Sequence, residues 1–277
     1  DARTSRGGDV LLGRETLVDE LIDATRRAAR GNGALFVLTA EAGMGKTSVA
    51  RSVAAQVLDE VEVSWSNCTT DLSAPPFWPW RGLVNVDIHG PPAGEEADRA
   101  IGAERYNLLN GLRDELLARR HARLLVIEDL QWADVSSVLL LHHVASAVVT
   151  TPMLIVATLR TGEPLGARLR AAVDELSGVA TTRDLPPLSV DSIEALMRRV
   201  SPTPDPGLAA LVAHRTGGNP LFVTELIATA RTARSQTALR DVIEGSVPTR
   251  VADSIARRLS RLPDQVSGGK DRAVHTD

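Results

Sequence analysis

The sequence predicts an α/β fold, in which a parallel five-stranded sheet is followed by an all-helical unit. Over the first two thirds of the chain, short apolar runs alternate with segments of helical periodicity. Residues 124–127 are apolar at every position, which indicates a strand buried on both faces of the sheet. After Pro186 and Pro187 only helical patterns remain, so we expect a domain boundary there.

Each expected element follows from the spacing of its apolar residues. Strands are expected at 34–39, 61–65, 124–127, 153–158 and 179–185. Helices are expected at 15–30, 46–58, 103–119, 135–148, 165–176, 191–200, 206–215, 220–231 and 248–262. Pro220 and Pro248 suit first helical positions, where the missing N–H has no partner to lose. Asp191 and Glu194 have the spacing of a capping box.

These elements divide the chain into four segments. Residues 1–9 are expected to be a flexible N-terminus, 10–187 an α/β domain and 188–247 a helical domain. The last segment, 248–277, is expected to hold the start of a further helical region and a polar tail. The chain does not begin with Met, so we expect a piece of a longer protein.

Composition excludes several classes of protein. The 277 residues are 43% hydrophobic, which excludes disorder over most of the chain. The net charge of -4 gives no overall attraction to nucleic acid or to an anionic membrane. One cysteine excludes an intramolecular disulfide and fits the cytoplasm. No apolar run reaches the roughly 18 residues of a membrane span, and no signal peptide is visible.

Lysine is unusually rare, since Lys46 and Lys270 are the only two among 31 basic residues. Lys46 lies in the segment Ala40-Glu41-Ala42-Gly43-Met44-Gly45-Lys46-Thr47, after the first expected strand. This segment meets the phosphate-loop pattern G-x-x-x-x-G-K-[ST] everywhere except at its first position. An ammonium can reach between the β- and γ-phosphates, where the wider guanidinium is a poor substitute.

The residue types of this loop suit a nucleotide with its Mg²⁺. Glycine lets the backbone curl so that N–H groups face phosphate oxygens, and the N-terminus of the following helix favours an anion. Ala40, in place of the first glycine, requires only that this position avoid a positive φ. We expect Thr47 to supply a hydroxyl to Mg²⁺. The expected phosphate-binding residues are Ala42, Gly43, Met44, Gly45, Lys46, Thr47 and Ser48.

Two acids follow the third expected strand. Adjacent carboxylates at the end of a buried strand are costly unless a cation or a polar cavity compensates them. We expect Glu128 to contact Mg²⁺ and Asp129 to polarise an attacking water, with Lys46 also acting in catalysis. Arg160 comes just after the fourth expected strand. Its side chain would sense the γ-phosphate if that strand lies between the first and the third.

Several motifs in order carry a resemblance to a known family. They are Leu11-Leu12-Gly13-Arg14-Glu15, Gly45-Lys46-Thr47, Pro76-Phe77-Trp78-Pro79-Trp80, Glu128-Asp129-Leu130-Gln131-Trp132-Ala133-Asp134, Arg160 and Thr216-Gly217-Gly218-Asn219-Pro220. Together they resemble the AAA+-like P-loop ATPase module of STAND-class signalling ATPases, in particular large ATP-binding LuxR-type transcriptional regulators. Glu128 stands where that family more often has Asp.

The resemblance implies a P-loop NTPase with sheet order 5-1-4-3-2, a helical lid and, in residues 248–277, the start of a winged-helix or helical region. It implies that Gly13 and Arg14 lie near the adenine and that Pro220 packs on the base. It also implies a weak Mg²⁺-dependent ATPase in which ADP holds a closed form and ATP an open, self-associating one. DNA would then be contacted only through a domain outside this chain.

Two other functions stay open. One is an AAA+ motor or loader acting on DNA, which needs an arginine supplied in trans and DNA-stimulated turnover. The other is a non-catalytic scaffold with structurally bound nucleotide.

Overall fold

The computed structural model describes residues 11–71, 74–81, 83, 97–118, 121–199 and 207–230. The chain divides between Pro187 and Leu188 into two compact units. The expected flexible N-terminus, the helix expected at 248–262 and the segment 248–277 lie outside the described residues. No described helix has the length and apolar character needed to cross a bilayer.

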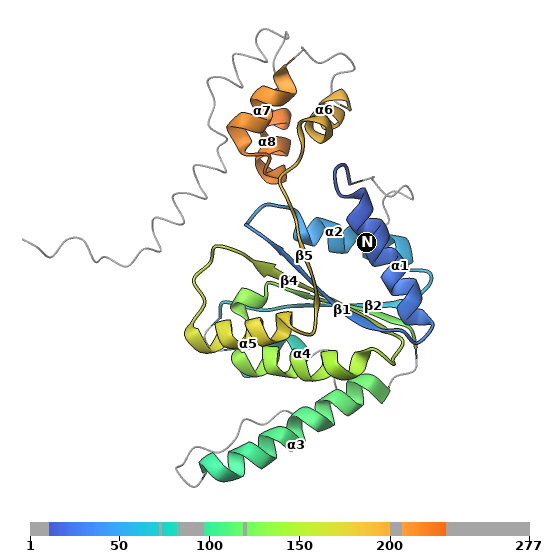
Figure 1. The fold of residues 1–277 in the computed structure, drawn as a ribbon, viewed down its shortest axis with the longest axis vertical. Coiled ribbons are helices and arrows are strands. Elements are labelled where there is room, and N and C mark those ends of the chain that lie inside the picture. The colour runs from blue at the N-terminus through green and yellow to red at the C-terminus, as the bar shows by residue number, and fades with distance from the viewer. Residues whose placement is uncertain are drawn as a thin grey trace, which may run out of the picture. The chain divides into compact units, whose positions relative to one another are not determined.

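The first unit alternates helices with strands, as predicted (Figure 1). Its elements are α1 Glu15–Ala29, β1 Ala34–Ala40, α2 Lys46–Val57, β2 Glu62–Asn67, η1 Trp78–Trp80, α3 Ala97–Ala118, β3 Arg123–Glu128, η2 Leu130–Trp132, α4 Val135–Val148, β4 Met153–Arg160, α5 Ala167–Ser177 and β5 Thr181–Asp184. The largest difference from expectation is α3, which begins at Ala97 rather than at residue 103.

The five strands form one parallel sheet in the order β2-β3-β4-β1-β5, which confirms the predicted order. β4 therefore lies between β1 and β3. In the register, Ala40 pairs with Arg160 across β1 and β4, and Asn67 pairs with Glu128 across β2 and β3. The carboxyl ends of four strands thus meet at one edge, where ligands of such sheets bind.

Alternate residues of each central strand pack into two separate layers. One face of the sheet, with side chains such as Phe36, Leu124 and Val156, packs with α1 and α2. The opposite face, with Val37 and Ile127, packs with α3, α4 and α5 (Figure 1). Because both faces are covered, the central strands read as continuous apolar runs.

The second unit contains α6 Val190–Arg198, α7 Leu208–Thr216 and α8 Pro220–Ala230 among its described residues. Eight buried apolar side chains of these described helices form a core of their own together with Leu188, which precedes α6. The capping box expected at Asp191 was wrong, since the N-cap of α6 is Ser189, whose side chain accepts from Ser192 N. The expected start of α8 is correct, because Pro220 is its first residue and Asn219 Oδ1 accepts from Leu221 N at 3.1 Å.

Candidate functional site

The loop after β1 leads directly into α2. Gly43 and Gly45 have φ values of 82° and 90°, in the left-handed region that glycine adopts without strain. Gly45 is the N-cap residue of α2. Ala40 stays in β1, and the only described non-glycine residues with positive φ are Phe77 and Asp129. The loop therefore keeps its curled course without the first glycine of the pattern.

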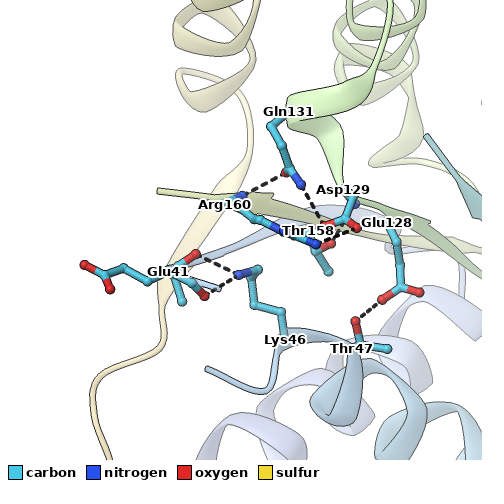
Figure 2. Close-up of polar contacts among 9 residues, drawn as sticks. Glu41, Lys46, Thr47, Glu128, Asp129, Gln131, Thr158 and Arg160 are labelled. Atoms are coloured by element: carbon cyan, nitrogen blue, oxygen red, sulfur yellow. Dashed lines mark hydrogen bonds and ion pairs between the residues drawn. The ribbon is translucent and has the colours of Figure 1, made fainter. Parts of the chain in front are cut away.

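Lys46 is held beneath this loop. Its side chain is buried, and its Nζ donates to the carbonyl oxygens of Ala40 at 2.7 Å and Glu41 at 2.9 Å (Figure 2). The pKa of Lys46 is lowered to about 8, chiefly by burial and also by the charge of Arg160, while the charges of Asp129 and Asp184 oppose the shift. An anion bound beside the ammonium would favour its charged form.

Thr47 and Glu128 are joined across the sheet edge. The Thr47 hydroxyl donates to Glu128 Oε1, and Trp65 Nε1 donates to Glu128 Oε2 at 2.9 Å. Glu128 is buried, with a relative exposure of 8%. Figure 2 shows Thr47 on the first turn of α2, pointing at the carboxylate from β3.

These oxygen atoms fit a magnesium ion. Among the described residues, no three His, Cys, Asp or Glu side chains cluster as a metal cage. Mg²⁺ does not require one, because it is commonly held by one or two carboxylates together with substrate phosphates and water. Glu128 and Thr47 supply a carboxylate and a hydroxyl of the required kind, next to the phosphate loop.

Asp129 faces a different set of partners from Glu128. It adopts a left-handed conformation, with φ 62° and ψ 52°, which turns the chain at the end of β3. Its N–H donates to Thr158 Oγ1 at 2.9 Å, and its carboxylate accepts from Gln131 Nε2 at 2.8 Å. Arg160 Nε lies 3.2 Å from Asp129 Oδ1, and the Arg160 N–H donates to Gln131 Oε1 at 3.0 Å (Figure 2).

Gly13 and Arg14 precede α1. The Arg14 guanidinium donates to Pro186 O and, at 3.2 Å, to Gly13 O, while its buried Nε has no hydrogen-bond partner. Burial lowers the pKa of Arg14, and the charges of Asp184 and Glu15 oppose the shift. Asp184, at the end of β5, thus acts electrostatically on both Arg14 and Lys46.

Comparison with known proteins identifies the family. The AAA ATPase domain family matches residues 10–156, more than half of the chain. The chain belongs to the AAA ATPase domain family. No curated protein matches it.

Solved structures share the fold of this AAA ATPase domain. The Aeropyrum pernix ORC1 protein in complex with DNA is 17% identical, with TM-score 0.56 over 92% of this chain and 70% of that chain. The Thermotoga maritima RuvB Holliday junction branch migration motor is 15% identical, with TM-score 0.50 over 85% and 70% of the two chains. At these identities the likeness shows the fold, a P-loop AAA+ fold, and nothing finer.

Within the AAA ATPase domain, five expected side chains meet at the carboxyl ends of β1, β3 and β4. They are Lys46, Thr47, Glu128, Asp129 and Arg160. Among the other expected loop residues, Met44 is buried and Ser48 is exposed on α2. Their contacts with phosphate remain a prediction. Pro220 belongs to the second unit, so its contact with a base remains a prediction.

Four residues of this region were not predicted as site residues. Trp65, Gln131, Thr158 and Asp184 contact or influence the expected ones. Asp184 and Thr158 lie near the carboxyl ends of their strands, the same signal that singled out Arg160. Trp65 lies within β2 and carries no such signal.

Proposed function

We propose that this chain is an ATP-binding switch module of a transcriptional regulator, which hydrolyses ATP slowly. The observation that carries the proposal is the convergence of an ammonium, a hydroxyl, two carboxylates and a guanidinium at one sheet edge. Each belongs to a residue type that phosphoryl chemistry uses. The position fits the general rule that α/β sheets bind ligands outside the carboxyl ends of their strands.

Binding and metal contact are assigned to separate residues. The loop from Ala42 to Ser48 would hold the phosphates, and Lys46 would move from the Ala40 and Glu41 carbonyls to phosphate oxygens. Thr47 and Glu128 would hold Mg²⁺, which when bound neutralises charge on the phosphates. Gly13, Arg14 and Pro220 would contact the base, as the resemblance to STAND-class ATPases implies.

Asp129 and Arg160 would distinguish ATP from ADP. In the structure the two side chains pair with each other. A γ-phosphate is a competing acceptor for the Arg160 guanidinium, so ATP would free Asp129 to orient a water, whereas ADP would leave the pair intact. Such a difference in contacts between two ligands is what a nucleotide switch requires. The ATP form would self-associate, and DNA would be contacted through a domain outside this chain.

Calorimetry and size measurements test this proposal. Purified protein should bind ATP and ADP with different affinities in the presence of Mg²⁺, and light scattering should detect self-association with ATP. Equal affinities without any change in size or shape would overturn the switch. Lys46→Ala should abolish nucleotide binding, and unchanged binding would overturn the nucleotide site as a whole.

A motor or loader acting on DNA is the second candidate function. The fold shared with RuvB and with ORC1 in complex with DNA favours it, while the net charge of -4 does not. Turnover measured with and without duplex DNA separates the two. DNA-stimulated hydrolysis supports the motor, whereas hydrolysis that is slow and indifferent to DNA supports the switch.

A further inference from the structure

We propose that Trp65 is a positioning residue for Glu128, and that its indole N–H sets how tightly the site holds Mg²⁺. The proposal rests on the proposed function, in which Glu128 is the carboxylate that contacts the metal. It assigns a role to a residue that no phosphate-loop or strand-end motif contains.

The register of the sheet explains how the indole reaches the carboxylate. Glu128 pairs with Asn67 of β2, so Trp65 lies two residues back along the same strand. Two residues of a strand span about 6.6 Å. Because side chains alternate between the two faces of a strand, Trp65 lies on the same face of β2 as Val63. Only a long side chain with a donor near its end spans this offset, and the indole places Nε1 2.9 Å from Glu128 Oε2.

Both carboxylate oxygens are thereby fixed. Oε1 accepts from the Thr47 hydroxyl and Oε2 accepts from Trp65, so the plane of the carboxylate is set from two sides. Indole is a donor only, and a carboxylate oxygen has two lone pairs. The Trp65 N–H therefore orients Glu128 while leaving it able to contact a cation.

The length of Glu128 makes such an anchor useful. A glutamate has one more rotatable bond than an aspartate, and ordering that bond costs side-chain entropy. A hydrogen bond present before the metal arrives removes part of this cost from metal binding. The long indole side chain of Trp65 thus orients Glu128, a carboxylate that is longer and has more rotational freedom than an aspartate.

The test is Trp65→Phe, which keeps an aromatic ring at a half-buried position and removes the N–H. ATP binding is measured by calorimetry over a series of Mg²⁺ concentrations, and the half-saturating Mg²⁺ concentration should rise about tenfold. ATP affinity in excess EDTA should stay unchanged. A merely structural role would instead lower the unfolding temperature and leave the Mg²⁺ dependence in place.

Two further variants make the result decisive. Trp78→Phe is the matched control, since Trp78 is 46% exposed and its change should leave the Mg²⁺ dependence unaltered. In a Glu128→Asp background the shorter carboxylate no longer reaches the indole, so Trp65→Phe should add less than about a twofold effect.

Three results would overturn the proposal: an unchanged Mg²⁺ dependence in Trp65→Phe, the same shift in Trp78→Phe, or a full tenfold effect in the Glu128→Asp background. A wild-type chain that binds no ATP would instead refute the proposed function, so the two failures are distinguishable.

Discussion

The Asp129 carboxylate and the Arg160 guanidinium form an ion pair, with Nε 3.2 Å from Oδ1 and Nη2 3.3 Å from Oδ2. One residue follows β3 and the other ends β4, and the Gln131 amide bridges them by bonding to the Asp129 carboxylate and to the Arg160 N–H. The group expected to polarise water and the group expected to sense the γ-phosphate therefore restrain each other.

Replacing Asp129 by Asn should separate catalysis from binding. If Asp129 orients the attacking water, turnover should fall by about 100-fold or more. ATP affinity should stay within about threefold of wild type, because Lys46 and Thr47 are untouched. Phosphate release and calorimetry measure the two quantities. Asp174→Asn, a change at an exposed position of α5, is the control. Wild-type turnover in the Asp129→Asn protein would assign catalysis to another group.

Replacing Lys46 by Arg should not preserve nucleotide binding. Lys46 is only 7% exposed and its ammonium sits between two carbonyl oxygens, where the larger planar guanidinium does not fit. ATP affinity measured by calorimetry should fall at least about tenfold. Lys270→Arg, at the other lysine of the sequence, should leave it unchanged. Equal affinity in Lys46→Arg would mean that a general positive charge suffices.

A substitution at Gly33 tests how closely the backbone packs where α4 leads into β4. A Cβ at this position would lie 2.2 Å from Val148 O, 2.6 Å from Met153 O and 2.7 Å from Thr151 O, all backbone atoms. Gly33→Ala should lower the free energy of unfolding by about 1–3 kcal/mol, as forced overpacking does.

The control for Gly33 is a glycine with free space around it. A Cβ at Gly111, within α3, would meet nothing within 4 Å. Gly111→Ala should therefore be neutral or stabilise by up to about 1 kcal/mol. Urea titrations of both variants measure the difference, and equal midpoints would contradict the close approach at Gly33.

Cys68 is a probe of unfolding because it is the only cysteine. Burial, together with the charges of Asp134 and Asp129, raises the pKa of its thiol to about 12. Because the thiolate is the reactive form, alkylation by iodoacetamide should be slow in the native chain at pH 8 and fast in urea. Rapid alkylation of the native chain would contradict the buried position.

The same shift predicts the direction of a pH effect. The unfolded thiol loses its proton near its ordinary pKa of about 9, while the folded thiol keeps it up to about 12. Between these values the folded state binds more protons than the unfolded state, so stability falls as pH rises. Urea midpoints of wild type and Cys68→Ser, compared at pH 8 and pH 10.5, isolate this contribution. If the difference in urea midpoint between wild type and Cys68→Ser were the same at both pH values, the predicted contribution of the Cys68 thiol would be contradicted.

Local signals predicted most element boundaries. The helix expected at 135–148 has those bounds in α4. Asp134 defines its start by accepting from Ser137 N at 3.0 Å. The start of α6 was wrong because Ser189 and Asp191 both suit an N-cap, and the extended backbone at Ser189 decides between them. The predicted start of α3 at residue 103 was too late, because the helix continues through Gly102. Glycine has a low helix propensity, but here it does not end the helix.

The sequence by itself determined the parallel sheet, the phosphate loop and the acids after the third strand, because periodicity, glycine placement and charge next to apolar runs are local properties. It did not determine which of these groups would touch. The Asp129–Arg160 pair and the Trp65–Glu128 hydrogen bond join residues 31 and 63 positions apart. Only the tertiary structure decided them, because such contacts depend on which strands are neighbours and on the register between them.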